Sequence, residues 1–264
     1  MKQFPNRTLF LQMLKREITQ TIKGSAFGFL WLILNPLLMM ALYTVVFGGL
    51  FRGSFTGGAG ETSWHYALGI YIGISLVNFF NEGLSRASTL IRANENLVKK
   101  VVFPLAILPA VLTFSIGFKL VVNLLLCLFF AIAINQSVNL SLLWIYPVVL
   151  IICLTMGLGL SMWISSVTVY VRDCQQITPI LTQVIFWTSG IFYSLEKTQE
   201  APLIWMFLQW NPFIHLIDYL RKALLWEVTP ASQSLVFPAF VAGFALFVGN
   251  FFFSRLKKGF PDLI

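Results

Sequence analysis

The chain has 264 residues, of which 58% are hydrophobic, 16% aromatic and only 11% charged. A soluble domain usually carries about a quarter charged residues, so this chain has too little polar surface to cover a soluble body of its size. The apolar content also excludes intrinsic disorder. A net charge of +8 does not by itself indicate nucleic-acid binding in a chain this apolar. The composition predicts a polytopic, all-α membrane protein.

The first segment in chain order, Phe4 to Lys23, has the pattern of an amphipathic helix. Phe10, Leu14 and Ile18 recur near helical spacing, with basic residues on the other faces. A helix of this kind lies in the headgroup region and is attracted by anionic lipid. We therefore expect residues 1–27 to form a cytoplasmic interface helix that at least anchors the chain.

Six apolar runs follow, which we take as candidate membrane spans. A helix needs roughly 20 residues to cross a hydrocarbon core of about 30 Å. The runs are Gly28 to Phe51, Trp64 to Leu84, Pro104 to Ile134, Leu142 to Tyr170, Pro179 to Leu195 and Leu235 to Ser254. The fifth run is short. The third is longer than one span needs, so it is a tilted helix, a helix kinked at Pro109, or two short segments.

Two stretches between the fifth and sixth runs, Leu203–Trp210 and Phe213–Leu225, are too short to span comfortably. Asn211-Pro212 breaks the helix between them. The pattern predicts a re-entrant or interfacial hairpin on the outer side.

The distribution of positive charge sets the orientation. With six spans, 13 of the 18 Lys and Arg residues fall on the side of both termini, and the positive-inside rule places that side in the cytoplasm. We expect a single domain over 1–264, with a six-span bundle at 28–254 and a cytoplasmic tail at 255–264. Lys119 alone lies within a span, and we expect it to extend to the cytoplasmic headgroups.

Polar and aromatic side chains form stripes on two of the spans. Asn35, Met39, Tyr43 and Phe47 form an i, i+4 ridge on the first, and Gln183, Trp187, Gly190 and Ser194 a similar stripe on the fifth. Such faces stack on sugar rings and donate hydrogen bonds, although lipid contact and helix packing use aromatic residues equally well. In the fourth span, Gly157, Gly159 and Ser161 favour close helix packing.

Residues Ser85 to Lys100 form a cytoplasmic segment of mixed charge. Leu90, Leu97 and Val98 leave a small apolar patch there that a soluble partner could contact. Such a segment is more usually just solvated.

The sequence holds no G-x-x-x-x-G-K-[ST] phosphate loop and no common hydrolase or metalloprotease motif. Three widely spaced cysteines form no metal pattern, and we expect no metal site and no catalytic residues. An enzyme acting on lipid-linked sugars, with His65, Glu61 and His215 as catalysts, is the weaker alternative.

Several fragments together resemble the ABC-2 type permeases of polysaccharide exporters, especially O-antigen export permeases. The fragments are Lys23-Gly24-Ser25-Ala26-Phe27-Gly28, Leu34-Asn35-Pro36, Glu95-Asn96-Leu97-Val98-Lys99-Lys100, Arg172-Asp173, Asn211-Pro212-Phe213 and Tyr219-Leu220-Arg221-Lys222. Their order and spacing cover nearly the whole chain.

The resemblance implies one subunit of a homodimeric channel in the bacterial inner membrane. Two separate ATPase subunits would bind ATP and Mg, contacting this chain at Glu95, Asn96, Leu97, Lys99 and Lys100. The implied cargo is a polysaccharide on a lipid diphosphate, and the interface helix would frame its lateral opening. Cations that would meet the diphosphate are Arg7, Arg16, Lys23, Arg86 and Arg92. The channel-lining candidates are Asn35, Met39, Tyr43, Phe47, Gln183, Trp187 and Ser194. Capsule and teichoic acid exporters share this plan.

Overall fold

A computed structural model of the chain describes residues 4–22, 27–46, 55, 63–100, 103–135, 143–226, 228 and 230–263, and these residues form helices without strands. The α-helices are α1 (Phe4–Ile22), α2 (Trp31–Tyr43), α3 (Ser63–Ala93), α4 (Glu95–Lys100), α5 (Ile107–Asn135), α6 (Ile145–Tyr170), α7 (Cys174–Thr188), α8 (Leu195–Thr198), α9 (Pro202–Leu208), α10 (Pro212–Leu225), α11 (Val236–Leu256) and α12 (Phe260–Leu263). Short 3-10 turns are η1 (Gly28–Leu30), η4 (Ser232–Leu235) and η5 (Lys257–Gly259). The predicted all-α fold is confirmed.

Among the described residues, four helical segments are long and apolar enough to cross a membrane: Trp64–Ala93, Ile107–Ala133, Ile145–Tyr170 and Ser232–Gly259. The first and fifth predicted spans are shorter, because α2 has 13 residues and α7 has 15. Residues 47–51 of the first predicted span lie outside the described part of the chain. The number of complete crossings therefore stays a prediction.

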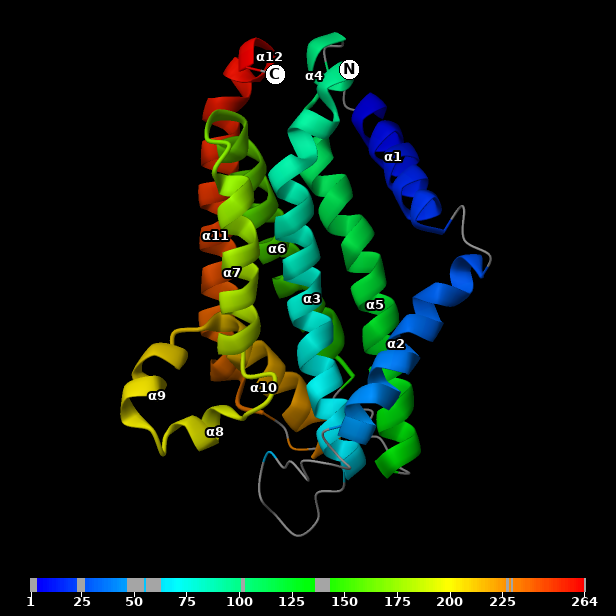
Figure 1. The fold of residues 1–264 in the computed structure, drawn as a ribbon, viewed down its shortest axis with the longest axis vertical. Helices are drawn as coiled ribbons and strands as arrows, with labels where there is room; N and C mark the ends of the chain where they lie inside the picture. Colours follow the sequence, from blue (N-terminus) through cyan, green and yellow to red (C-terminus); the bar gives the residue numbers. More distant parts are fainter. Residues whose placement is uncertain are drawn as a thin grey trace.

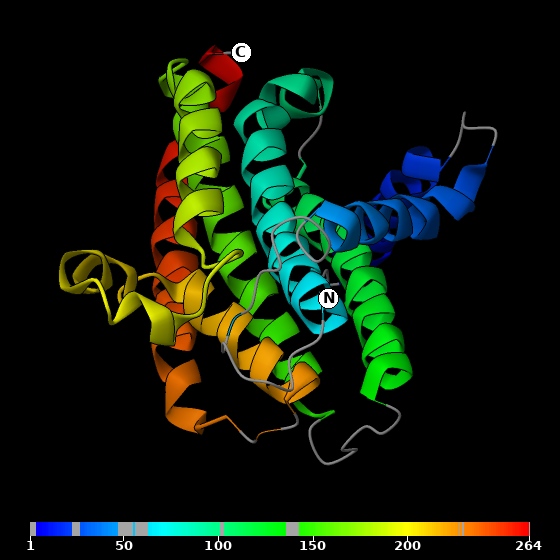
Figure 2. The ribbon, with the colours of Figure 1, turned by 60° about the horizontal axis from the view of Figure 1, so that its bottom comes forward.

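The long helices α3, α5, α6 and α11 run side by side (Figure 1). The colours show the chain descending from one end of the bundle along α1 and then α2, returning along α3, and then alternating along α5, α6, α7 and α11. Both termini and α4 therefore lie at one end of the bundle (Figure 1). In Figure 2, α1 and α2 project to one side of the bundle and α8 and α9 to the other.

The long run from Pro104 to Ile134 forms one continuous helix, α5, which begins at Ile107. Pro109 lies in its first turn, where a proline removes no intrahelical hydrogen bond. The alternatives of a kink at this proline or of two short segments are therefore wrong.

The contact between α6 and α11 depends on two glycines. A Cβ added at Gly159 would run into the backbone of Ala245 and Leu246, and one added at Gly249 would run into the backbone of Gly159. The two helix backbones thus touch directly, as small residues permit in membrane bundles. The predicted packing role of Gly159 is confirmed.

Helices form in the predicted N-terminal segment and in both stretches of the predicted hairpin. Helix α1 lies along α5, where Phe10 meets Phe114 edge-on at 5.7 Å between ring centroids. In the hairpin, α9 is largely exposed and α10 is largely buried. Asn211 caps α10: its side chain accepts a hydrogen bond from the Phe213 amide at 2.9 Å and donates one to the Thr188 carbonyl at 2.9 Å.

The fifth span departs from its predicted bounds. Helix α7 starts earlier, at Cys174, and ends at Thr188. Gly190 then adopts φ +77°, a left-handed conformation that glycine takes without strain. The chain turns away from the bundle there towards α8 and α9, so the stripe read through Gly190 to Ser194 does not continue on one helix.

Candidate functional site in the membrane bundle

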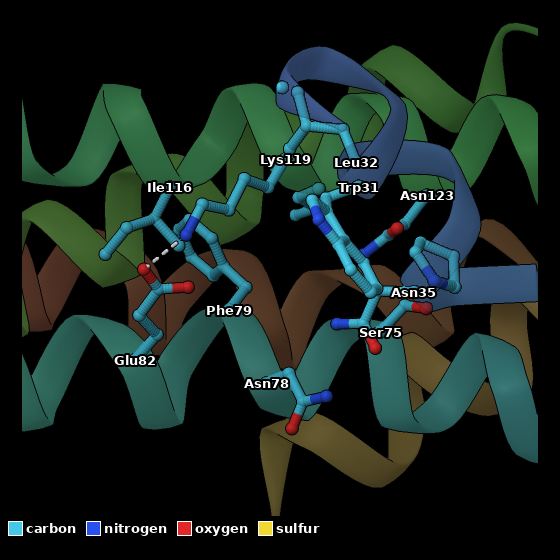
Figure 3. A pocket seen from close by; sticks show the side chains of 13 residues that line it. Trp31, Leu32, Asn35, Ser75, Asn78, Phe79, Glu82, Ile116, Lys119 and Asn123 are labelled. Carbon is cyan, nitrogen blue, oxygen red and sulfur yellow. Dashed lines mark hydrogen bonds and ion pairs between the residues drawn. The ribbon is translucent and has the colours of Figure 1, made fainter. Parts of the chain in front are cut away.

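A pocket of about 440 Å³ lies between α2, α3 and α5 (Figure 3). Its lining is unusually polar for helices of this composition and comprises Gly28, Trp31, Leu32, Asn35, Pro36, Ser75, Asn78, Phe79, Glu82, Ile116, Lys119, Leu120 and Asn123. Its volume is in the range of small-molecule sites. Three carboxamides, a hydroxyl and an ion pair therefore line one open space between apolar helices.

The depth of this pocket follows from helix geometry. Trp64 is exposed at the start of α3, a position typical of a membrane surface. At a rise of 1.5 Å per residue along the axis of α3, Ser75 lies about 17 Å beyond Trp64 and Glu82 about 27 Å beyond it. With Trp64 at one surface of a core about 30 Å thick, the pocket extends from the middle of the bilayer to its opposite boundary.

Glu82 and Lys119 form an ion pair across the pocket, with 2.7 Å between Oε1 and Nζ (Figure 3). An unpaired charge within an apolar helix is costly, and the pairing offsets that cost. Lys119 therefore pairs with a carboxylate of the neighbouring helix, and its expected extension to the headgroups stays a prediction. The sequence carried the signal, because two ionisable residues of opposite charge lie within adjacent apolar runs.

The ion pair belongs to a larger network that reaches the interface helix. Arg86 on α3 contacts Glu82 at 3.3 Å and also pairs with Glu17 on α1. Two carboxylates and two cations, including Lys119, thus join α1, α3 and α5 with no net charge. Arg86, proposed as a diphosphate ligand, is held between two carboxylates, with which a phosphate would have to compete.

The remaining entrance candidates are not gathered in one place. Arg92 donates to the carbonyls of Thr168 (3.4 Å) and Val169 (3.3 Å), where a cation also complements the C-terminal dipole of α6. Arg7 and Arg16 are exposed on α1, but nine positions apart they face opposite sides of the helix. Lys23 lies outside the described residues.

The predicted channel-lining residues separate into exposed and buried ones. Asn35 and Met39 on α2 are exposed, and so are Gln183 and Trp187 on α7. Tyr43 is half-buried against the main core, and Phe47 lies outside the described residues. Helices α2 and α7 both contact α3 (Figure 1), so the exposed members lie on two helices that neighbour the same long helix.

Ser194 is not among these exposed residues. Its side chain is buried and donates to the Phe55 carbonyl at 3.3 Å. The turn at Gly190 separates it from the helical face that carries Gln183 and Trp187.

The coupling candidates do come together, on the six-residue helix α4 at the end of the bundle that carries both termini. Glu95, Asn96 and Lys99 are exposed, and Lys99 pairs with Glu95 at 2.7 Å. The hydrogen bond from Lys99 and its charge lower the pKa of Glu95 below its ordinary value. The side chain of Lys100 is not among those described.

The apolar patch expected on residues 85–100 is covered by the chain itself. Val98 is buried, and Leu97 and Leu90 pack partly buried against the same cluster. The side that α4 offers to a partner is therefore its polar side.

Sequence reasoning missed Arg221, which it counted as a charge of the outer loop. The guanidinium is fully buried and donates to four carbonyls: Gly69 (3.0 Å), Gly190 (2.7 Å), Ile191 (2.5 Å) and Tyr193 (3.3 Å). It also lies over the ring of Phe55 at 4.0 Å. This one side chain ties α10 to α3 and to the turn after α7.

Of the three catalysts of the alternative enzyme, His65 and His215 lie in the described part of the chain. His215 donates a hydrogen bond from Nε2 to the Gln209 carbonyl (2.8 Å) and meets Phe237 edge-on. Glu61 lies outside the described residues, so the full trio cannot be placed. Within the described part of the chain, no group of three or more His, Cys, Asp or Glu side chains is arranged to hold a metal.

Comparison with known proteins agrees with this architecture. The chain is 25% identical over 258 residues to the "O-antigen export system permease protein RfbA" of Myxococcus xanthus, covering 98% of this chain and 96% of that one. It is 23% identical to the protein of the same name from Klebsiella pneumoniae (97% and 95% covered) and 25% identical to the "Polysialic acid transport protein KpsM" of Escherichia coli (89% and 88%). A family model described as "ABC-2 type transporter" matches residues 8–225. The chain therefore belongs to the ABC-2 type transporter family.

Proposed function

We propose that this chain is the permease subunit of an ABC exporter that moves a lipid-linked polysaccharide, of O-antigen type, across the bacterial inner membrane. Two copies form the conduit, with their termini in the cytoplasm. Two separate ATPase subunits bind ATP and Mg and act on α4. The family supports a transport role, and the names of the full-length relatives point to the cargo.

The observation that carries the proposal is the polar pocket between α2, α3 and α5. Polar and ionisable residues inside a membrane are costly and mark the paths of polar cargo. The carboxamides of Asn35, Asn78 and Asn123 each offer donors and an acceptor. Sugar hydroxyls exchange hydrogen bonds with such groups, and the pocket itself is overall neutral, which suits a neutral polyol better than an ion.

The exposed side of the bundle supplies the route. Asn35 and Met39 on α2, Asn78 on α3, and Gln183 and Trp187 on α7 are exposed on three neighbouring helices. A second copy facing this side would enclose a path lined by amides and aromatic rings. Aromatic faces let sugar rings slide past without gripping one unit.

A capsular polysaccharide exporter is the second candidate. The likeness to a protein named for polysialic acid transport favours it, over a somewhat smaller share of both chains. Polysialic acid is anionic, and the pocket has no excess of cations to attract it. The O-antigen type of cargo is therefore preferred.

The test is ATP-dependent transport in vesicles that contain this chain, its cognate ATPase and a labelled lipid-linked glycan. We expect glycan to accumulate across the membrane only with both proteins and ATP. Asn78→Leu is expected to slow export, whereas Asn250→Leu, the same exchange at an exposed site on α11, leaves it unchanged. Transport without the ATPase, or equal effects of the two exchanges, would contradict the proposal.

A further inference from the structure

The segment after α11 does not extend from the bundle as a free tail. It forms η5 and α12, and α12 contacts both α4 and α6. Figure 1 shows α12 and α4 at the same end of the molecule. The C-terminal segment is therefore part of the folded cytoplasmic end, in contrast to the predicted tail at 255–264.

Phe260 anchors this segment and is fully buried. Its ring meets Phe253 of α11 edge-on at 5.7 Å and Tyr170 at the end of α6 at 6.4 Å. The Tyr170 hydroxyl donates to the Leu256 carbonyl at 2.9 Å, and a Cβ on Gly259 would collide with that hydroxyl. The turn into α12 is thus fitted closely against the ends of α6 and α11.

The same residue belongs to the apolar cluster beneath α4. We call this the cytoplasmic cluster, and its buried members are Ile91, Val98, Leu108, Met162, Val169, Phe253 and Phe260. It is separate from the main core, and it draws on α3, α4, α5, α6, α11 and α12. One small cluster therefore joins α4 to the ends of four long helices.

Helix α4 cannot hold its own orientation. Six residues are too few for a helix to be stable by itself, and its outer side is polar and exposed. Val98 on its inner side packs into the cytoplasmic cluster. The position of α4 is therefore set by what it rests on, and part of that support is the C-terminal segment.

We propose that Phe260 is a positioning residue for energy coupling: it holds α4 so that a push from the ATPase on α4 reaches α6 and α11. The proposal rests on the proposed function, since it assumes an ATPase partner at α4. It differs from a merely structural role, in which α12 only adds stability to the bundle. The two roles separate in the ratio of glycan exported to ATP hydrolysed.

The experiment uses the full permease–ATPase complex in vesicles with three variants. Phe260→Ala removes the ring, Phe260→Leu keeps an apolar side chain, and Leu263→Ala alters an exposed position of α12 as the control. We expect Phe260→Ala to retain ATPase binding and ATP hydrolysis but to export about fivefold less glycan per ATP. Phe260→Leu recovers most of the loss, and Leu263→Ala behaves as the wild type.

A second measurement follows amide hydrogen exchange in α4, again in the complex. Exchange at residues 95–100 is expected to accelerate with Phe260→Ala and, to a smaller degree, with Phe260→Leu, which serves if Phe260→Ala does not assemble. A normal export ratio with unchanged α4 exchange would overturn the proposal. If the wild-type complex exports nothing, the proposed function fails, while the exchange measurement still decides whether Phe260 positions α4.

Discussion

Lys119 on α5 and Glu82 on α3 lie 2.7 Å apart, 37 positions distant in sequence, at one end of a polar pocket inside the bundle. Each charge would be costly alone in an apolar helix. The pair therefore constrains how α3 and α5 face each other. It also makes one end of the pocket that we assign to the cargo charged.

Removing one member of this pair is expected to destabilise the protein. Lys119→Met should lower the free energy of unfolding by about 1–2 kcal/mol, less than for a fully buried pair because both side chains are about a third exposed. Glu82→Gln should cost more, since Glu82 also contacts Arg86. Thermal unfolding in nanodiscs measures both. The double variant should lose less than the sum of the singles, and strictly additive losses would show that the two side chains do not interact.

The glycine contact between α6 and α11 yields a prediction with an internal control. Gly249→Ala forces a methyl group into the backbone of Gly159 and should cost about 3 kcal/mol or prevent folding. Gly243→Ala, on the same helix, meets nothing within 4 Å and should be neutral or stabilising by up to about 1 kcal/mol. Yield of monodisperse protein and the unfolding temperature distinguish them. Equal behaviour of the two variants would mean that α6 and α11 do not touch at Gly249.

Arg221 offers a comparison with the adjacent residue. Arg221→Lys keeps the charge but loses the planar fork that serves four carbonyls, and we expect it to cost about 2–3 kcal/mol. Lys222→Gln changes a partly exposed cation and should cost under about 1 kcal/mol. Limited proteolysis in the segment between α7 and α10 should increase only for Arg221→Lys. Resistance equal to the wild type would exclude a role for the fork in holding that segment.

The Glu95–Lys99 pair predicts a pH dependence of α4. Because the folded pKa of Glu95 is lowered, its contribution is present above the ordinary glutamate pKa and is lost as the pH falls through the lowered value. Protection of α4 amides from hydrogen exchange should therefore decrease on acidification, after correction for intrinsic rates. Glu95→Gln should abolish this dependence while leaving the helix in place. The same pH dependence in Glu95→Gln would assign it to another group.

The helices and their order could be predicted because they depend on local properties of the sequence. Apolar runs of sufficient length give the long helices, the spacing of Phe10 and its neighbours gives α1, and Asn211-Pro212 gives the start of α10. The close approach of another helix at Gly159 could also be predicted, since a glycine within an apolar span favours close helix packing.

The features that could not be predicted depend on distant partners. Arg221 was counted as a loop charge because its acceptors are backbone carbonyls up to 152 positions away. Every residue has such a carbonyl, so the sequence does not show which ones accept a hydrogen bond. The end of α7 was misplaced because the uncharged residues Thr188, Ser189 and Gly190 lead directly into apolar ones, while the backbone turns at Gly190. Burial of Ser194 and pairing of Lys119 likewise follow from tertiary contacts.

The tie made by Arg221 has a consequence for the environment on that side of the membrane. The end of the bundle opposite the termini faces, in our proposal, a compartment whose acidity follows the surroundings of the cell. A guanidinium stays charged across the whole biological range and backbone carbonyls do not titrate. The hydrogen bonds by which Arg221 ties the hairpin to α3 and to the turn after α7 therefore do not depend on the pH of that compartment.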